Sequence, residues 1–296
     1  MPNQTGPRVS ASRDLPSPRM YALLATRAPV AVVFRHGPHA HWSIARWDLT
    51  TDALTPGAWL HGSLYPRRCD ISPDGRLLYA FVLKGKVYGF LGAKGDMLAY
   101  STVSKVPWLF ALAAWKETGT WTRGYHFVEG GSPEERPWDI GPPQAGDAGP
   151  LRARYGVART APSQYAAERR RGWVEHERCP PRGKNDMWDE RRRVVLVRAR
   201  PGRSERLVLT DEGWDTGPGT IEGRRPTYHL ERWGKEEVLA EVTWADWDPR
   251  GRLLVATADG KLQIRDVDRE EVDVRWERDL SAKAVRGPAP ESARRW

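Results

Sequence analysis

The sequence predicts an all-β fold built from short antiparallel strands. Of the 296 residues, 40% are apolar and 15 are tryptophan, which is enough large apolar surface for a folded core. Helical periodicity is scarce, whereas short apolar or alternating runs recur between Gly, Pro and Asp residues. Two segments of the chain also repeat each other, which is typical of a fold assembled from similar units.

The apolar runs predict strands from residue 20 onwards. In the first half of the chain they cover residues 20–26, 30–34, 42–49, 77–83, 87–91, 97–103, 108–115 and 121–128. In the second half they cover residues 194–197, 207–210, 228–233, 238–247, 253–257, 262–266 and 272–276. Residues 1–19 contain four prolines and no apolar run, so we expect a flexible leader and not a secretory signal.

The internal repeat narrows the architecture. Residues 70–80 (DISPDGRLLYA) align without a gap to residues 246–256 (DWDPRGRLLVA), with seven of eleven positions identical. Each copy predicts two apolar strands joined by a tight turn at Gly75 or Gly251, where glycine adopts a positive φ without steric cost. A second hairpin and a fourth strand follow each copy. Four antiparallel strands in about 40 residues form one blade of a β-propeller.

These turns resemble the S-P-D-G-[RK] turns of bacterial WD40-like propeller repeats. The resemblance is clearest over residues 65–104 and 242–280 and extends to residues 20–64. It implies a single β-propeller of four-stranded antiparallel blades with loop insertions, followed by a C-terminal tail at 286–296. We expect five blades within residues 20–285, and six blades are the alternative. The five would lie near 20–64, 65–104, 105–162, 163–241 and 242–285.

Two local groups of polar residues were considered as catalytic or metal sites. His36, His39 and His41 are closely spaced, but no carboxylate or cysteine adjoins them, so we interpret them as surface residues of a hairpin. Asp70 and Asp74 lie four apart, but the repeat keeps an aspartate only at the first position. We therefore expect Asp70 to order backbone amides in its turn and Asp74 to be exposed. The sequence predicts no metal, no cofactor and no catalytic residue.

A basic segment is the most distinctive surface feature of the sequence. Residues 151–206 hold 16 basic and 7 acidic residues, and this surplus of nine equals the net charge of the whole chain. Within it we predict an insertion near 161–206 that binds a partner, because arginine and tryptophan are enriched at interfaces. The predicted contact residues are Arg169, Arg170, Arg171, Trp173, Arg178, Trp188, Arg191, Arg192 and Arg193. Six acidic residues lie beside or among these contact residues, so a solvated, internally paired loop is the alternative; they are Glu168, Glu175, Glu177, Asp186, Asp189 and Glu190.

The expected function is that of a non-catalytic scaffold that presents loops to an acidic protein surface or a larger assembly. One alternative hypothesis is that the Arg and Trp residues bind nucleic acid. Another is that the chain is a propeller hydrolase or lyase with a site in the central channel. Cys69 and Cys179 are the only cysteines, which favours a reducing, cytoplasmic location. No apolar run of 18 residues occurs, so we expect no membrane partner.

Overall fold

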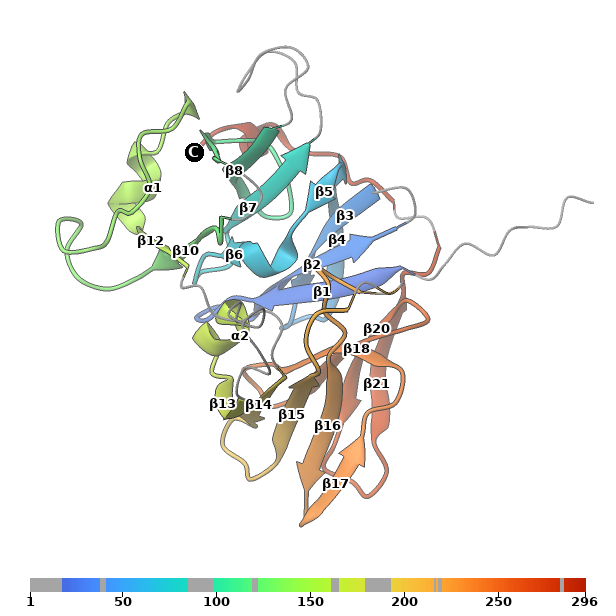
Figure 1. Cartoon of the computed structure of the whole chain (residues 1–296). Helices are drawn as coiled ribbons and strands as arrows, with labels where there is room; N and C mark the ends of the chain where they lie inside the picture. The colour runs from blue at the N-terminus through green and yellow to red at the C-terminus, as the bar shows by residue number, and fades with distance from the viewer. Residues whose placement is uncertain are drawn as a thin grey trace, which may run out of the picture.

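The computed structural model describes residues 18–37, 41–84, 98–118, 122–160, 165–178, 193–215, 217, 220–282 and 285–296. Strand accounts for 49% of the structure and helix for 8%, so the predicted all-β class is confirmed. Among the described residues the strands form five sheets (Figure 1), which are built from consecutive strands except that β11 (Ala145–Gly146) of the second sheet lies between the two strands of the third in the sequence. Among the described residues, no helix is both long enough and apolar enough to cross a membrane.

The first three sheets occupy the N-terminal half. The first sheet has the order β1 (Arg19–Leu24), β2 (Val30–His36), β3 (His41–Asp48) and β4 (Ala53–His61). The second has the order β11 (Ala145–Gly146), β9 (Ala113–Lys116), β8 (Leu98–Lys105), β7 (Leu77–Lys84) and β5 (Ser63–Leu64), and β6 (Asp70–Ile71) also pairs with β7. The third consists of β10 (Tyr125–Val128) and β12 (Gly156–Arg159). Short helices join these strands: η1 (Pro66–Arg68) and α1 (Gly149–Arg154).

The fourth and fifth sheets form the C-terminal half. After α2 (Ala166–Arg170), the fourth sheet runs β13 (Val174–Arg178), β14 (Val194–Ala199), β15 (Arg206–Asp211), β16 (Thr227–Arg232) and β17 (Lys235–Val238). The fifth runs β18 (Val242–Trp247), β19 (Leu253–Thr257), β20 (Lys261–Asp266) and β21 (Asp273–Asp279). The helix η4 (Glu291–Arg294) lies near the end of the chain.

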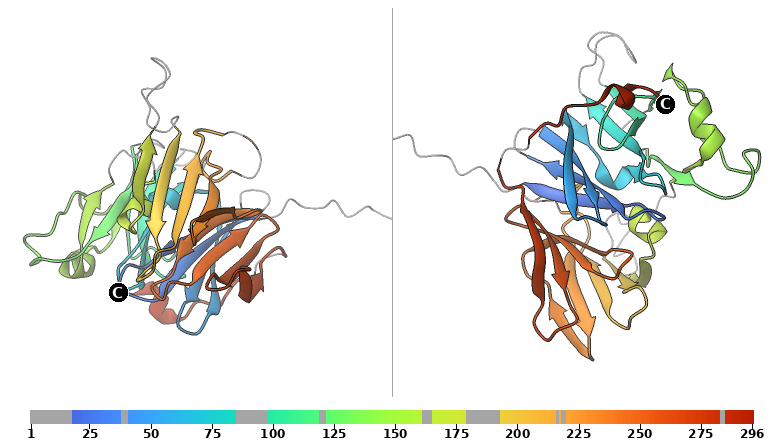
Figure 2. Two further views of the ribbon diagram at one scale, coloured as in Figure 1. Left: turned by 90° about the horizontal axis from the view of Figure 1, so that it is seen from below. Right: turned by 180° about the vertical axis from the view of Figure 1, so that it is seen from behind.

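Neighbouring sheets contact one another through individual strands. β1 contacts β6 of the second sheet and β18 of the fifth, β6 contacts β10, and β16 contacts β18. In both Figure 1 and the right view of Figure 2, the first sheet lies between the second and the fifth. Arg35 strengthens the joint to the fifth sheet, because its Nε donates to the Leu280 carbonyl at 2.6 Å and its Nη2 to the Ala282 carbonyl at 2.6 Å.

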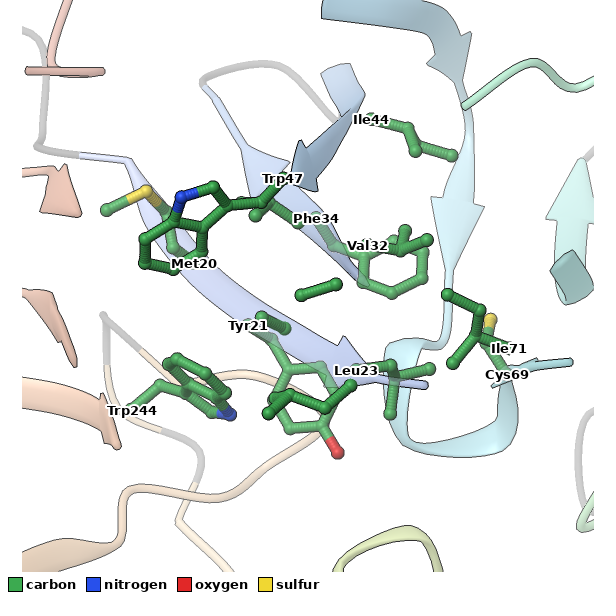
Figure 3. Close-up of a cluster of buried hydrophobic side chains, with 14 of the residues drawn as sticks. Met20, Tyr21, Leu23, Val32, Phe34, Ile44, Trp47, Cys69, Ile71 and Trp244 are labelled. Carbon is green, nitrogen blue, oxygen red and sulfur yellow. The ribbon is translucent and has the colours of Figure 1, made fainter. Parts of the chain in front are cut away.

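The hydrophobic core is divided among the interfaces between sheets. A large cluster includes Met20, Phe34, Trp47, Ile71 and Trp244 from the first, second and fifth sheets (Figure 3). Separate clusters fill the contacts between the fourth and fifth sheets and between the second and third. Burial of such side chains stabilises the fold by roughly 25 cal/mol per Å² of apolar area. The sheets are therefore held together mainly by apolar packing between their faces.

Several predicted strands have other bounds or partners in the structure. The predicted strand 238–247 is two strands, β17 and β18, because the chain turns at Glu241, whose φ is +60°. The strand expected at 87–91 lies outside the described residues, and β8 pairs directly with β7. Strand β9 then lies beside β8, so the second sheet continues to Lys116 instead of ending near residue 104.

The repeated turns form as predicted, but their hydrogen bonds come from other residues. Gly75 and Gly251 have φ values of +73° and +75°. The Ser72 hydroxyl accepts from the Leu77 amide at 2.8 Å, and the equivalent Asp248 carboxylate accepts from the Arg252 amide at 2.9 Å. The expectation that Asp70 orders the amides of its turn is wrong, because its carboxylate is buried and accepts from Arg171 and from the Phe127 amide instead.

The two ends of the chain were expected to lie outside the blades. The expected leader lies outside the described residues except for Pro18 and Arg19, and Arg19 opens β1. The C-terminal segment from residue 285 passes along the first and second sheets (Figure 2). The Gly287 amide donates to the Gly57 carbonyl at 3.2 Å, and Lys105 Nζ donates to the Ser292 carbonyl at 2.8 Å. This segment therefore packs on the sheets.

Candidate functional site

A cluster of buried polar side chains lies where strand β1, the short helix η1 and helix α2 meet. Glu168 of α2 accepts a hydrogen bond from the Tyr21 hydroxyl at 3.0 Å and forms an ion pair with Arg67 of η1. The Arg67 guanidinium lies 4.9 Å from the ring centre of Tyr21 and 4.5 Å from that of Tyr165, within cation–π range. In Figure 3 the Tyr21 hydroxyl points away from the apolar cluster. Burial and the nearby Glu168 raise the pKa of Tyr21, so this phenol stays protonated.

The second part of the cluster centres on Asp70 of β6. Its Oδ1 accepts from Arg171 Nη2 at 2.7 Å, and its Oδ2 accepts from the Phe127 amide of β10 at 3.0 Å. Arg171 also donates from Nε to the Leu24 carbonyl at 2.7 Å and from Nη1 to the Ala167 carbonyl at 2.9 Å. One ion pair thus joins β1, β6, β10 and the end of α2.

The repeat places a second buried carboxylate in the fifth sheet. Asp246 occupies the position equivalent to Asp70 and is 4% exposed, as Asp70 is. It forms an ion pair with Arg198 of β14, and its Oδ1 accepts from the Trp247 amide at 2.8 Å. Burial raises the pKa of Asp246, and the opposing charge of Arg198 lowers it. In both copies, therefore, the first aspartate links its sheet to a neighbouring segment through an arginine.

A cavity of about 300 Å³ adjoins Tyr21 and Arg67. Its other polar wall residues are Arg19, Arg224, Arg225, Thr227, Glu241 and Thr243. Arg224 pairs with Asp211 at 2.9 Å, and Arg19 Nη1 donates to the Thr220 carbonyl at 2.6 Å. Within the described part of the chain, no Ser, Cys or His lines this cavity. Its cations suit binding of a small polar or anionic group.

The structure brings some residues of the predicted basic insertion into the core. Trp173 is 3% exposed and packs against Tyr228, with 6.3 Å between ring centres. The Arg171 side chain is 5% exposed. The expectation that these two residues contact a partner is therefore corrected, because their side chains are buried against the chain itself.

The remaining insertion residues are partly accounted for. Arg169 forms an ion pair with Glu175, Arg170 lies 3.9 Å from Asp70, and Arg193 lies 2.8 Å from Glu177. At residues 169, 170 and 193, these pairs agree with the alternative hypothesis that the charged stretch is paired internally. Trp188, Arg191, Arg192 and the side chain of Arg178 lie outside the described residues.

The histidine and aspartate groups considered from the sequence lie in hairpins. The rings of His36 and Trp42 are 4.4 Å apart, and His41 lies 4.6 Å from His61, while His39 lies outside the described residues. In the part of the chain that is described, no group of three metal-ligating side chains converges. Asp74 accepts from the Ser72 hydroxyl at 2.6 Å, so it orders the turn and is not simply exposed.

Sequence reasoning missed the Tyr21, Arg67 and Glu168 cluster. Tyr21 and Glu168 are 147 residues apart, and no local motif marks any of the three. The repeat does mark one residue of the neighbouring buried ion pairs, because an aspartate recurs at positions 70 and 246. It does not indicate the arginines that pair with these aspartates. Arginines 171 and 198 could not be assigned to these aspartates before the sheets were placed.

No protein-family model and no curated protein matches this chain. Among solved structures, the chain is similar to Pyrococcus horikoshii acylaminoacyl peptidase, with 12% sequence identity and a TM-score of 0.33. The match covers 88% of this chain and 44% of that one, so the chain spans less than half the length of the peptidase. A likeness this distant decides neither the fold nor the activity of the chain.

Proposed function

We propose that the chain is a single five-bladed β-propeller that works as a non-catalytic binding module for an acidic protein surface. The five antiparallel sheets of the described residues support this architecture, as do the contacts of β1 with β6 and with β18. Contact between the first and last sheets is what closure of a propeller requires. Closed blades leave few free strand edges, so recognition falls to the loops between strands.

One observation carries the non-catalytic part of the proposal. Each guanidinium nitrogen of Arg171 donates to an acceptor of the chain itself: the Leu24 carbonyl, the Ala167 carbonyl and the Asp70 carboxylate. Three of the five N–H donors of Arg171 are thus engaged within the chain, and its side chain is only 5% exposed, so this group holds segments together and offers little surface to a substrate. The polar centre is thus explained as a structural joint between blades.

The proposed contact surface comprises the predicted contact residues of the basic insertion other than Arg171 and Trp173. It includes Arg191, Arg192 and Arg193, which follow one another directly in the sequence. The described residues outside the insertion add exposed tryptophans at loops, with Trp214 53% exposed and Trp233 55% exposed. Arginine and tryptophan on loops suit an acidic protein partner, because such residues dominate interface energetics.

A binding experiment with charge-reversed variants tests this proposal. The tagged full chain is incubated with a nuclease-treated extract of its source cells, and bound proteins are identified by mass spectrometry. One variant combines Arg191→Glu, Arg192→Glu and Arg193→Glu. The matched control combines Arg250→Glu, Arg269→Glu and Arg278→Glu, three exposed arginines of the fifth sheet and its loops. We expect a partner that the control retains and the insertion variant loses.

Two results would count against the proposal. If both variants retain the same proteins as the wild type, the insertion does not bind the partner. If the bound material disappears after nuclease treatment, nucleic acid is the ligand instead, and its affinity should fall steeply with salt.

A further inference from the structure

A second cavity, of about 490 Å³, lies away from the polar cluster, on the side of the fold where the C-terminal segment packs. Its wall combines residues of β3, of the turn between β6 and β7, of β8 and of α1 with Trp296. Its volume falls within the range of about 300–1,000 Å³ that is typical of small-molecule sites. None of the residues predicted from the sequence to bind a partner lines it.

The wall of this cavity is strongly basic. Four cations line it, Arg46, Arg76, Lys105 and Arg154, against the single carboxylate of Asp74. Asp74 is already engaged, because it accepts from the Ser72 hydroxyl at 2.6 Å and from the Arg76 amide at 3.1 Å. The charge that faces the cavity is therefore suited to a ligand with more than one negative charge.

Comparison of the two repeated turns singles out Arg76. Its equivalent, Arg252, donates to Asp248 at 2.7 Å and to Asp52 at 3.0 Å, and its side chain is 25% exposed. The Arg76 side chain is 74% exposed, and its Nε lies 3.8 Å from Asp74. The same repeat position is thus a structural ion pair in the fifth sheet and a solvent-facing cation in the second.

Trp296 supplies a donor and an apolar surface. Its indole Nε1 is buried and has no acceptor among the residues that the structure describes. A buried donor without an acceptor costs free energy, and an oxygen of a ligand would satisfy it. Leu77, Val106 and the Trp296 ring form an apolar part of the same wall.

We propose that this cavity binds a small organic phosphate, with the phosphate held by Arg76 and Arg154 and the organic part against the Trp296 ring. Guanidinium groups match phosphate because their planar N–H donors pair with two oxygens at once. A phosphate dianion balances the basic wall better than a carboxylate does. This site is independent of the proposed protein contact.

Isothermal titration calorimetry at fixed ionic strength, with phenyl phosphate as the probe, tests the proposal. We expect one-to-one binding to the full chain, weakened at least about tenfold by Arg76→Glu with Arg154→Glu, since each removes a charge-assisted hydrogen bond and adds repulsion. Arg278→Glu with Arg269→Glu is the matched control and should bind as the wild type does. Trp296→Phe, which removes the N–H donor and keeps a smaller aromatic ring, should weaken binding about tenfold.

Titration with inorganic phosphate shows whether the cavity prefers an organic phosphate to free phosphate. We expect inorganic phosphate to bind more weakly than phenyl phosphate. Equal affinity for the two would overturn the role of the organic part. Absence of saturable binding, or equal loss in the cavity variant and the control, would overturn the site. If the double variant does not fold, as judged by circular dichroism, Arg76→Gln carries the same test, since this side chain is exposed.

Discussion

Arg171 and Asp70, which are 101 residues apart in the sequence, form a buried ion pair with a distance of 2.7 Å between Nη2 and Oδ1. Each partner also binds backbone groups of other elements, so the pair joins the first and second sheets to α2 and to β10. Removing one partner of such a pair leaves a buried charge without its main counter-charge.

Arg171→Ala should therefore lower the free energy of unfolding by about 3–5 kcal/mol. Urea unfolding followed by tryptophan fluorescence measures the change. Arg193→Ala is the control, because the Arg193 ion pairs are exposed and contribute much less. Equal losses in the two variants would show that the Arg171 pair has no special structural role.

The two repeated turns should respond differently to the same substitution. Gly75→Ala and Gly251→Ala share the cost of a positive φ, roughly 1–2 kcal/mol. A Cβ at Gly75 would lie 2.9 Å from Val30 Cβ, a distance that requires a shift of the neighbour, whereas a Cβ at Gly251 would lie 3.2 Å from Arg200 Nε, which is less severe. We expect Gly75→Ala to destabilise the protein more in thermal unfolding, and the opposite order would contradict this packing argument.

Stability should fall in mild acid because folding partly buries two histidines, His36 and His126. Burial, together with nearby arginines, lowers the pKa values of His36 and His126 to about 4. In the unfolded chain a histidine has a pKa of about 6.5, so between these values the unfolded state binds more protons. The free energy of unfolding should therefore decrease as the pH falls from about 6.5 to 4.

His126→Asn should make this pH dependence shallower, which urea unfolding at several pH values would measure. Above pH 7 both histidines are neutral in either state. The test is therefore the change in the free energy of unfolding with pH, and not its absolute value at one pH. An unchanged slope in the variant would show that His126 does not titrate differently in the folded and unfolded chain.

Cys69 should be unreactive in the native protein. It is fully buried, and burial raises the pKa of its thiol well above the ordinary value, so the reactive thiolate does not form. In a Cys179→Ser background, a disulfide reagent such as dithionitrobenzoate should modify Cys69 only after denaturation. Rapid reaction of the native variant would indicate that the second sheet opens near β6.

Arg35→Ala should loosen the joint between the first and fifth sheets. The side chain donates to the carbonyls of Leu280 and Ala282, just after β21. Without these bonds, amide hydrogen exchange should accelerate in residues 273–282. Strands β14 to β16 should keep their exchange rates, and acceleration throughout the chain would indicate global destabilisation instead.

Most strands and the repeated turns could be predicted from local patterns. The predicted runs at 30–34, 253–257 and 262–266 match β2, β19 and β20 closely, because alternation of apolar residues and a glycine turn act over a few positions. The predictions failed where nearby residues do not decide the structure. Glu241 adopts a positive φ and divides an apolar run that reads as one strand.

The candidate site was less predictable. Trp173 and Arg171 read as surface residues because they lie in a charged stretch, yet Trp173 packs on Tyr228 and Arg171 binds Asp70. Which member of a charged stretch turns inward depends on the acceptors that other sheets present. Those acceptors lie about a hundred residues away, so the charge pattern alone does not identify it.

Local patterns in the chain were enough to predict the all-β class, the repeated turn at Gly75 and Gly251, and the concentration of basic charge in residues 151–206. Which of these charges are buried depends on how the sheets pack, and so does the placement of Arg76 and Arg154 at one cavity. The difference lies in the sequence distance over which each kind of interaction acts. Strand and turn preferences arise from contacts within a few residues, whereas ion pairs and cavities depend on surfaces that meet only after the sheets have packed.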